Sequence, residues 1–190
     1  MGIEESIREF RAELRQRSAS EVVQRHITSG ECATLSAASY FELRNRLATR
    51  YEVHISEVLI VGSAKTGFSI APDKRYRPFG ETSDIDVVIC SSNLFDAFWK
   101  DVFEYWARGE SWPLFGDFRK YLFRGWIRPD KLPPAASFRR AHEWWEFFRS
   151  LSSSGVFGPY KITGALYKSW HVLECYQQKC VRECILQEGD

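Results

Sequence analysis

At 190 residues and 22.1 kDa, the chain has the length of one domain and can bury roughly two-thirds of the surface that its unfolded form exposes. Its hydrophobic content of 44% and charged content of 27% are ordinary for a globular protein, and no stretch approaches the about 18 uninterrupted apolar residues of a membrane span. The formal net charge of +1 excludes a globally basic surface for nucleic acid, so any basic patch has to be local. We therefore expect a cytoplasmic protein without a membrane partner.

The first 50 residues carry the pattern of three helices. In residues 3–17, apolar side chains recur at helical spacing, namely Ile3, Ile7, Phe10 and Leu14. Ser18 and Glu21 form a capping box that opens a second helix, and Gly30 marks its end. A third helix is predicted over residues 36–50.

Two short apolar runs rich in β-branched residues, 58–61 and 87–89, have the length and composition of buried strands. Asp84 and Asp86 lead into the second run and fall on one face of it, because side chains along a strand alternate with a period of two. Two like charges that are buried together are unfavourable unless a cation lies beside them. A divalent metal such as Mg²⁺ is the simplest such cation.

Gly62 and Ser63 directly follow the first predicted strand. A glycine lets the backbone pass close to a ligand, and free N–H groups at the start of a helix or turn suit an anion. Residues 69–82 are expected to form a surface loop that joins the two strands. The cations near this site are Lys65, Lys74, Arg75 and Arg77. They would neutralise a triphosphate, contact a nucleic-acid backbone or be solvated, and Arg75 or Arg77 would alternatively pair with the two aspartates as a buried ion cluster.

The second half of the chain is predicted to be mainly helical. The expected elements are a helix from Ser91 or Ser92 through Phe103, a break at 109–113, a helix at 115–124, a three-proline connector at 125–134, a helix at 135–151, a strand at 160–167 and a helix at 170–186. The seven Trp, eight Tyr and fourteen Phe form either a bulky core or a stacking surface for bases or a partner. The five cysteines lack zinc-site spacing, which predicts reduced structural thiols.

The order of an apolar strand, Gly62-Ser63 and then Asp84-x-Asp86 resembles the DNA polymerase β-type nucleotidyltransferase superfamily. The match covers about the middle fifth of the chain, and small bacterial single-domain members with a G-S-A-K-T-G turn and an S-D-I-D strand are similar. The resemblance implies an α/β (α+β) fold with a palm-like mixed β-sheet flanked by helices. We expect one domain with N-terminal helices in 1–50, the motif-bearing core in 51–110 and an aromatic-rich helical extension in 111–190.

The resemblance also implies an activity, the Mg²⁺-dependent transfer of a nucleoside monophosphate from a nucleoside triphosphate to an acceptor hydroxyl, with Mn²⁺ as a second usable metal. The acceptor would be a nucleic acid, a tRNA, a nucleotide or a protein side chain. Asp84 and Asp86 would bind the metal, and together with Lys65 they would be catalytic. The residues expected to bind the nucleotide are Gly62, Ser63, Lys65, Thr66 and Ser83.

Members of this superfamily that catalyse usually have a third carboxylate on a later strand, and the predicted strand at 160–167 has none. The other acids considered for this role are Asp96, Asp101, Asp117, Asp130 and Glu143, and Lys161 or Lys168 would instead bring a positive charge that binds phosphate. The alternative to an enzyme is therefore a catalytically impaired nucleotide-binding module of a toxin–antitoxin or anti-phage defence system, which would act with a partner protein.

Overall fold

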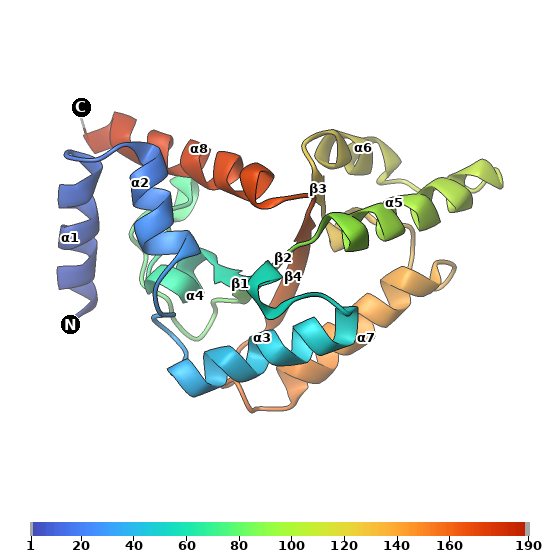
Figure 1. The fold of residues 1–190 in the computed structure, drawn as a ribbon, viewed down its shortest axis with the longest axis horizontal. Helices are drawn as coiled ribbons and strands as arrows, with labels where there is room; N and C mark the ends of the chain where they lie inside the picture. The colour runs from blue at the N-terminus through green and yellow to red at the C-terminus, as the bar shows by residue number, and fades with distance from the viewer. Residues whose placement is uncertain (1, 189–190) are drawn as a thin grey trace.

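A four-stranded open sheet lies at the centre of the molecule, with helices against both of its faces (Figure 1). The structure, a computed structural model, describes residues 2–188. The strands are β1 (Val58–Val61), β2 (Ile85–Cys90), β3 (Trp126–Ile127) and β4 (Ile162–Tyr167), in the spatial order β1-β2-β4-β3. β2 is antiparallel to β1 and parallel to β4, and β3 is antiparallel to β4. This arrangement confirms the predicted mixed sheet flanked by helices.

The alternation of side chains along the strands divides the interior into two cores. On β2, Ile85, Val87 and Ile89 face one core. Val88 and Cys90 face the other core, on the side to which Asp86 also points. The strand register sets Asp86 opposite Val61 of β1 and opposite Thr163 of β4.

Four helices pack around the first core. They are α3 (Ala37–Tyr51), α5 (Ser92–Ala107), α6 (Phe115–Phe123) and α7 (Arg139–Ser153). Trp144 and Phe148 of α7 lie so near β4 that a Cβ atom on Gly164 would be 2.1 Å from Phe148 Cζ and 2.7 Å from Trp144 Cζ2. Only glycine permits this close approach of helix and strand.

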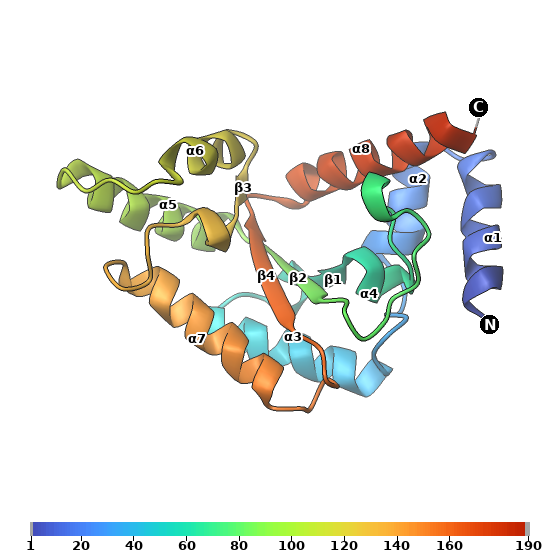
Figure 2. The same ribbon diagram turned by 180° about the vertical axis from the view of Figure 1, so that it is seen from behind.

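The opposite face of the sheet is covered by elements from both ends of the chain, as Figure 2 shows. They are α1 (Ile3–Leu14), α2 (Ala19–Val23), the π-helix η1 (Gln24–Thr28) and α8 (Trp170–Glu188). The start of α1 and the end of α8 lie at the same end of the molecule (Figure 1). The short helix α4 (Gly62–Thr66) and the 3-10 turns η2 (Ile55–Glu57), η3 (Pro72–Lys74) and η4 (Pro129–Lys131) complete the secondary structure of residues 2–188.

Several local predictions are confirmed. In the capping box of α2, Glu21 N donates to Ser18 Oγ at 3.3 Å, and Ser18 N donates to Glu21 Oε2 at 2.9 Å. Ser36 caps α3 by accepting from Ser39 N at 3.1 Å. β1 has the predicted bounds, and all five cysteines are free thiols.

Other local predictions are wrong in their bounds. The connector predicted at 125–134 contains β3, which is held by its pairing with β4. α7 begins at Arg139 rather than near residue 135, because a turn in which Phe138 N donates to Pro134 O comes first. α1 ends at Leu14, earlier than predicted. Among residues 2–188, no helix combines the length and the apolar character that crossing a membrane requires.

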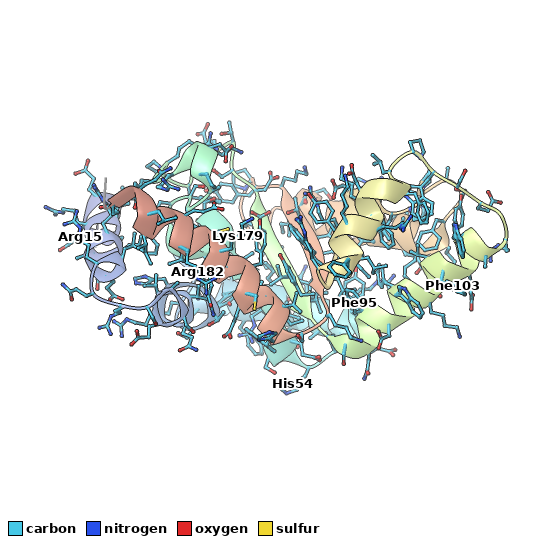
Figure 3. All side chains as sticks on the ribbon, turned by 90° about the horizontal axis from the view of Figure 1, so that it is seen from above. Arg15, His54, Phe95, Phe103, Lys179 and Arg182 are labelled. Carbon is cyan, nitrogen blue, oxygen red and sulfur yellow. The ribbon has the colours of Figure 1, made fainter. Side chains whose placement is uncertain are left out.

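The aromatic residues divide between the core and the surface. Phe10, Phe68, Phe98 and Trp144 are fully buried, whereas Trp99, Phe103 and Trp106 of α5 are between 46% and 48% exposed. Phe103 lies on the outer half of α5, away from the sheet (Figure 3). Aromatic residues therefore fill the core and also form a surface ridge.

Candidate functional site

A cavity of about 640 Å³ lies on the face of the sheet that α8 covers. It is bordered by the ends of β1 and β2, by the loop between them, by β3 and β4, and by one side of α8. Five of the residues predicted to form the site line this cavity, namely Gly62, Ser63, Ser83, Asp84 and Asp86. The structure thus brings together the two motifs that are separated in the sequence.

Asp86 lies on the floor of the cavity, in the middle of the sheet. Thr163 Oγ1 donates to its Oδ1 at 2.7 Å, and the described residues offer its Oδ2 neither a hydrogen bond nor a cation within 4.0 Å. Burial raises the pKa of the Asp86 carboxyl; the hydrogen bond from Thr163 opposes this shift, and the negative charge of Asp84 adds to it. Asp86 is therefore a carboxylate whose charge is incompletely compensated.

Asp84 precedes β2 and faces the same cavity with a partly exposed side chain. Its Oδ2 lies 3.8 Å from Lys161 Nζ, a long ion pair that water screens. Within residues 2–188 no group of three or more His, Cys, Asp or Glu side chains is placed to hold a metal by itself. Mg²⁺ commonly takes one or two carboxylates and completes its shell with water and substrate phosphates, so Asp84 and Asp86 fit a metal that binds together with its substrate.

Gly62 allows the chain to turn directly beside Asp86. Its φ is +65°, in the left-handed region, and a Cβ atom there would lie 3.0 Å from Asp86 Oδ2. A side chain at this position would occupy the space in front of the carboxylate oxygen that has no partner. The glycine is therefore required both for the turn and for access to Asp86.

Lys65 and Thr66 do not line the cavity, in contrast to the sequence-based expectation. Lys65 is 3% exposed, and its Nζ donates to Gly30 O at 2.7 Å and to Glu31 O at 2.9 Å. Thr66 Oγ1 donates to Phe68 O at 2.5 Å. The one-turn helix α4 directs Lys65 toward the loop after η1 and Thr66 toward the residues that follow α4. Both side chains therefore bind backbone carbonyl groups in this structure and do not face the cavity.

The loop cations separate into two groups. Lys74 and Arg77 line the cavity, and neither forms an ion pair with a described residue. Arg75 turns away, and its Nη2 donates to Glu183 O at 3.4 Å on α8. Neither Arg75 nor Arg77 lies within 4.0 Å of Asp84 or Asp86, so the buried ion cluster considered from the sequence is absent among residues 2–188.

Among residues 2–188, no third carboxylate joins Asp84 and Asp86 to form a metal-binding group. Four of the five acids considered lie outside the cavity, where each pairs with a basic side chain: Asp96 with Lys168, Asp101 with Arg140, Asp117 with Lys120, and Glu143 with Arg50 and Arg139. Asp130 does line the cavity, but Arg128 Nε and Nη2 donate to its two oxygens at 3.0 and 3.1 Å. The position on β4 that faces Asp86 is occupied by Thr163, a residue that the sequence pattern did not single out.

Further residues of the cavity are not predicted as site residues from the sequence, among them Trp126, Thr163 and Gln177. They lie on β3, β4 and α8. Each reaches the cavity through long-range packing, which a local pattern does not record. One signal is present in the sequence: the polar Gln177 lies at helical spacing between the apolar residues Leu173 and Val181, which indicates a polar group on a buried helix face.

Comparison of the chain with models of protein families, with curated proteins and with solved structures gives no match.

Proposed function

We propose that the protein is a Mg²⁺-dependent nucleotidyltransferase that transfers a nucleoside monophosphate from a nucleoside triphosphate to an acceptor hydroxyl. The observation that supports this most is the Asp86 carboxylate, which has one hydrogen bond and no cation among the described residues. Three basic residues, Lys74, Arg77 and Lys161, line the same cavity, and we call them the rim cations. Lys74 and Arg77 form no ion pair with a described residue, and Lys161 has only the long ion pair of 3.8 Å with Asp84. A carboxylate that lacks a cation, next to these cations, is complementary to a metal ion with a polyphosphate.

Each part of the cavity would have a distinct role. Asp84 and Asp86 would hold the metal, which when bound neutralises charge on the phosphates. Thr163 fixes one oxygen of Asp86 and leaves the other free to face the ligand. The rim cations would balance the remaining negative charge of the triphosphate. During transfer, the acceptor oxygen would form a bond to the α-phosphorus and give up its proton to water, while the bond to the bridging oxygen breaks and its electron pair leaves with pyrophosphate.

A second function, nucleotide binding without transfer, is favoured by one observation. Thr163 faces Asp86 where an acid would complete a two-metal site, and the described residues contain no group of three acids, cysteines or histidines placed to bind metal. Such a module would act in a toxin–antitoxin or anti-phage defence system through a partner protein. Both functions use nucleoside triphosphates, so we expect a cytoplasmic location.

Pyrophosphate release separates the two functions. Labelled nucleoside triphosphates with Mg²⁺ or Mn²⁺ are incubated with the protein and a panel of acceptors: an oligonucleotide, tRNA, free nucleotides and the protein itself. A transferase releases pyrophosphate, Asp86→Asn abolishes this release, and Asp117→Asn, an exposed acid outside the cavity, leaves it unchanged.

Binding measured by calorimetry completes the test. Triphosphate binding that depends on Mg²⁺ and Asp86 without pyrophosphate release supports the binding module. Absence of any Asp86-dependent binding contradicts both functions.

A further inference from the structure

The cavity extends beyond the two aspartates along the sheet toward α8. Its far end is formed by Trp126 of β3, Tyr167 of β4, and Tyr176 and Gln177 of α8. The total volume of about 640 Å³ lies within the range of pockets that enclose whole small molecules. The charged end and this far end are thus parts of one ligand-sized cavity.

Gln177 is a buried polar residue without a partner. It is 5% exposed, it lines the cavity, and its side-chain amide makes no hydrogen bond with any residue in 2–188. The adjacent Gln178 differs, since it donates to Ser20 Oγ at 3.4 Å and accepts from Arg182 Nη2 at 3.1 Å. Buried amides in native proteins are hydrogen-bonded, so an amide that faces a cavity without a protein partner is available to hydrogen-bond water or a ligand there.

Trp126 supplies an aromatic wall through its ring, because its buried Nε1 is closed off from the cavity. Its ring lies nearly parallel to that of Tyr167, with centroids 5.3 Å apart, and 4.9 Å from the ring of Tyr176. Burial raises the pKa of Tyr176 to about 12, so its hydroxyl remains neutral at physiological pH. This end of the cavity is therefore aromatic, and its nearest cation is the Arg128 guanidinium, whose Cζ lies 5.4 Å from the centroid of the Trp126 ring.

We propose that this far end is a nucleobase subsite, in which a base lies along the wall of Trp126, Tyr167 and Tyr176 and Gln177 hydrogen-bonds its edge. Aromatic side chains bind the planar faces of bases of every kind, whereas an amide offers an adjacent donor and acceptor that match a base edge. The Gln177 amide presents its donor and its acceptor side by side, so bases whose edges differ in donors and acceptors are expected to bind with different affinities. The inference rests on the proposed function, because the triphosphate at the aspartates carries the base into the subsite.

The test compares inorganic tripolyphosphate with ATP, GTP, CTP and UTP, each with Mg²⁺, by titration calorimetry on the full chain. We expect at least one nucleotide to bind 10-fold or more tightly than tripolyphosphate, and the four nucleotides to differ from one another. Gln177→Met, which keeps the length of the side chain, is expected to remove most of this advantage and to leave tripolyphosphate binding unchanged. Gln178→Met is the matched control on the same helix and is expected to change neither affinity.

Gln177→Glu is a second variant for the case that Gln177→Met folds poorly. It keeps the acceptor and loses the donor, so it is expected to change the order of preference among the bases. Nucleotides that bind no more tightly than tripolyphosphate, or an order of preference unaltered in both Gln177 variants, would overturn the subsite. If tripolyphosphate binding is also independent of Asp86, the proposed function fails as well, so the two failures are distinguishable.

Discussion

Asp86 combines a ligand-facing position with an unfavourable charge. Its pKa is raised, chiefly because burial disfavours the charged form, so the folded chain binds this proton more tightly than the unfolded chain does. The free energy of unfolding therefore falls as the pH rises from the ordinary value of 3.8 through the raised pKa. The ionised Asp86 therefore lowers the stability of the folded protein, and a bound cation would offset this loss.

Asp86→Asn removes this titration and keeps an oxygen that accepts from Thr163. We expect the variant to melt at a higher temperature than the wild type at about pH 7 without divalent cations, since the uncompensated charge is gone. The difference should shrink as the pH is lowered and disappear below 3.8, where the Asp86 carboxyl is protonated in both the folded and the unfolded wild type. Adding Mg²⁺ and triphosphate should stabilise only the wild type. Thermal melts across this pH range check the expectation, and a variant less stable at every pH would contradict it.

Lys65 shows where a motif residue has a structural role instead. Its ammonium donates to two carbonyl oxygens, and hydrogen bonds of charged groups contribute about 1.5–3 kcal/mol to stability. We expect Lys65→Met to lower the free energy of unfolding by about this amount, measured by urea denaturation, while tripolyphosphate affinity stays unchanged. A loss of affinity at unchanged stability would return Lys65 to the ligand site.

At the scale of elements, the contact of β4 with α7 holds the strand that carries Thr163. Gly164→Ala would place a Cβ atom 2.1 Å from Phe148 Cζ, so α7 or β4 has to shift. Overpacking of this kind costs about 1–3 kcal/mol, and we expect a loss of stability in that range together with weaker ligand binding. Gly116→Ala in α6, where nothing lies within 4 Å, is the control and should be neutral or slightly stabilising. Equal effects of the two variants in urea denaturation would contradict the packing argument.

Elements defined by local chemistry could be predicted, and those defined by distant partners could not. Ser18 and Glu21 form their capping box within four residues, and the apolar run of β1 is recognisable by itself. β3 has only two residues and exists because Trp126 and Ile127 pair with Tyr167 and Leu166. The same reasoning separates the site residues, because Asp84 and Asp86 lie in a local motif whereas Thr163 and Gln177 arrive from the far end of the chain.

At the scale of the whole molecule, Glu188 joins both ends of the chain to the loop that borders the cavity. It accepts from Arg11 Nε at 2.7 Å, from Arg15 Nη2 at 3.1 Å and from the Tyr76 hydroxyl at 3.1 Å. Figure 3 shows Arg15 at the end of the molecule where α1 and α8 meet. The pKa of Glu188 is lowered, first of all by the hydrogen bond from Arg11, so this carboxylate stabilises the folded state when it is ionised.

Glu188→Gln should have the opposite pH signature to Asp86→Asn. Because the folded pKa is depressed, the stabilisation is present above the ordinary value of 4.5 and is lost as the pH falls below it. We expect Glu188→Gln to melt below the wild type at about pH 7 and to approach it in acid. Glu174→Gln, on the same helix but without an ion pair to a described residue, is the control and should match the wild type throughout.

The strand order also determines at which point of its synthesis the chain can assemble the cavity around Asp86. β4 lies between β2 and β3, yet α5, α6, β3 and α7 all leave the ribosome before it does. A nascent chain that stops before β4 carries both aspartates but lacks the Thr163 hydroxyl that orients Asp86 and the Gln177 amide at the far end of the cavity. Pairing across such a sequence separation is slow to form. Under the proposed function, we therefore expect triphosphate binding only after residues 162–177 have been synthesised.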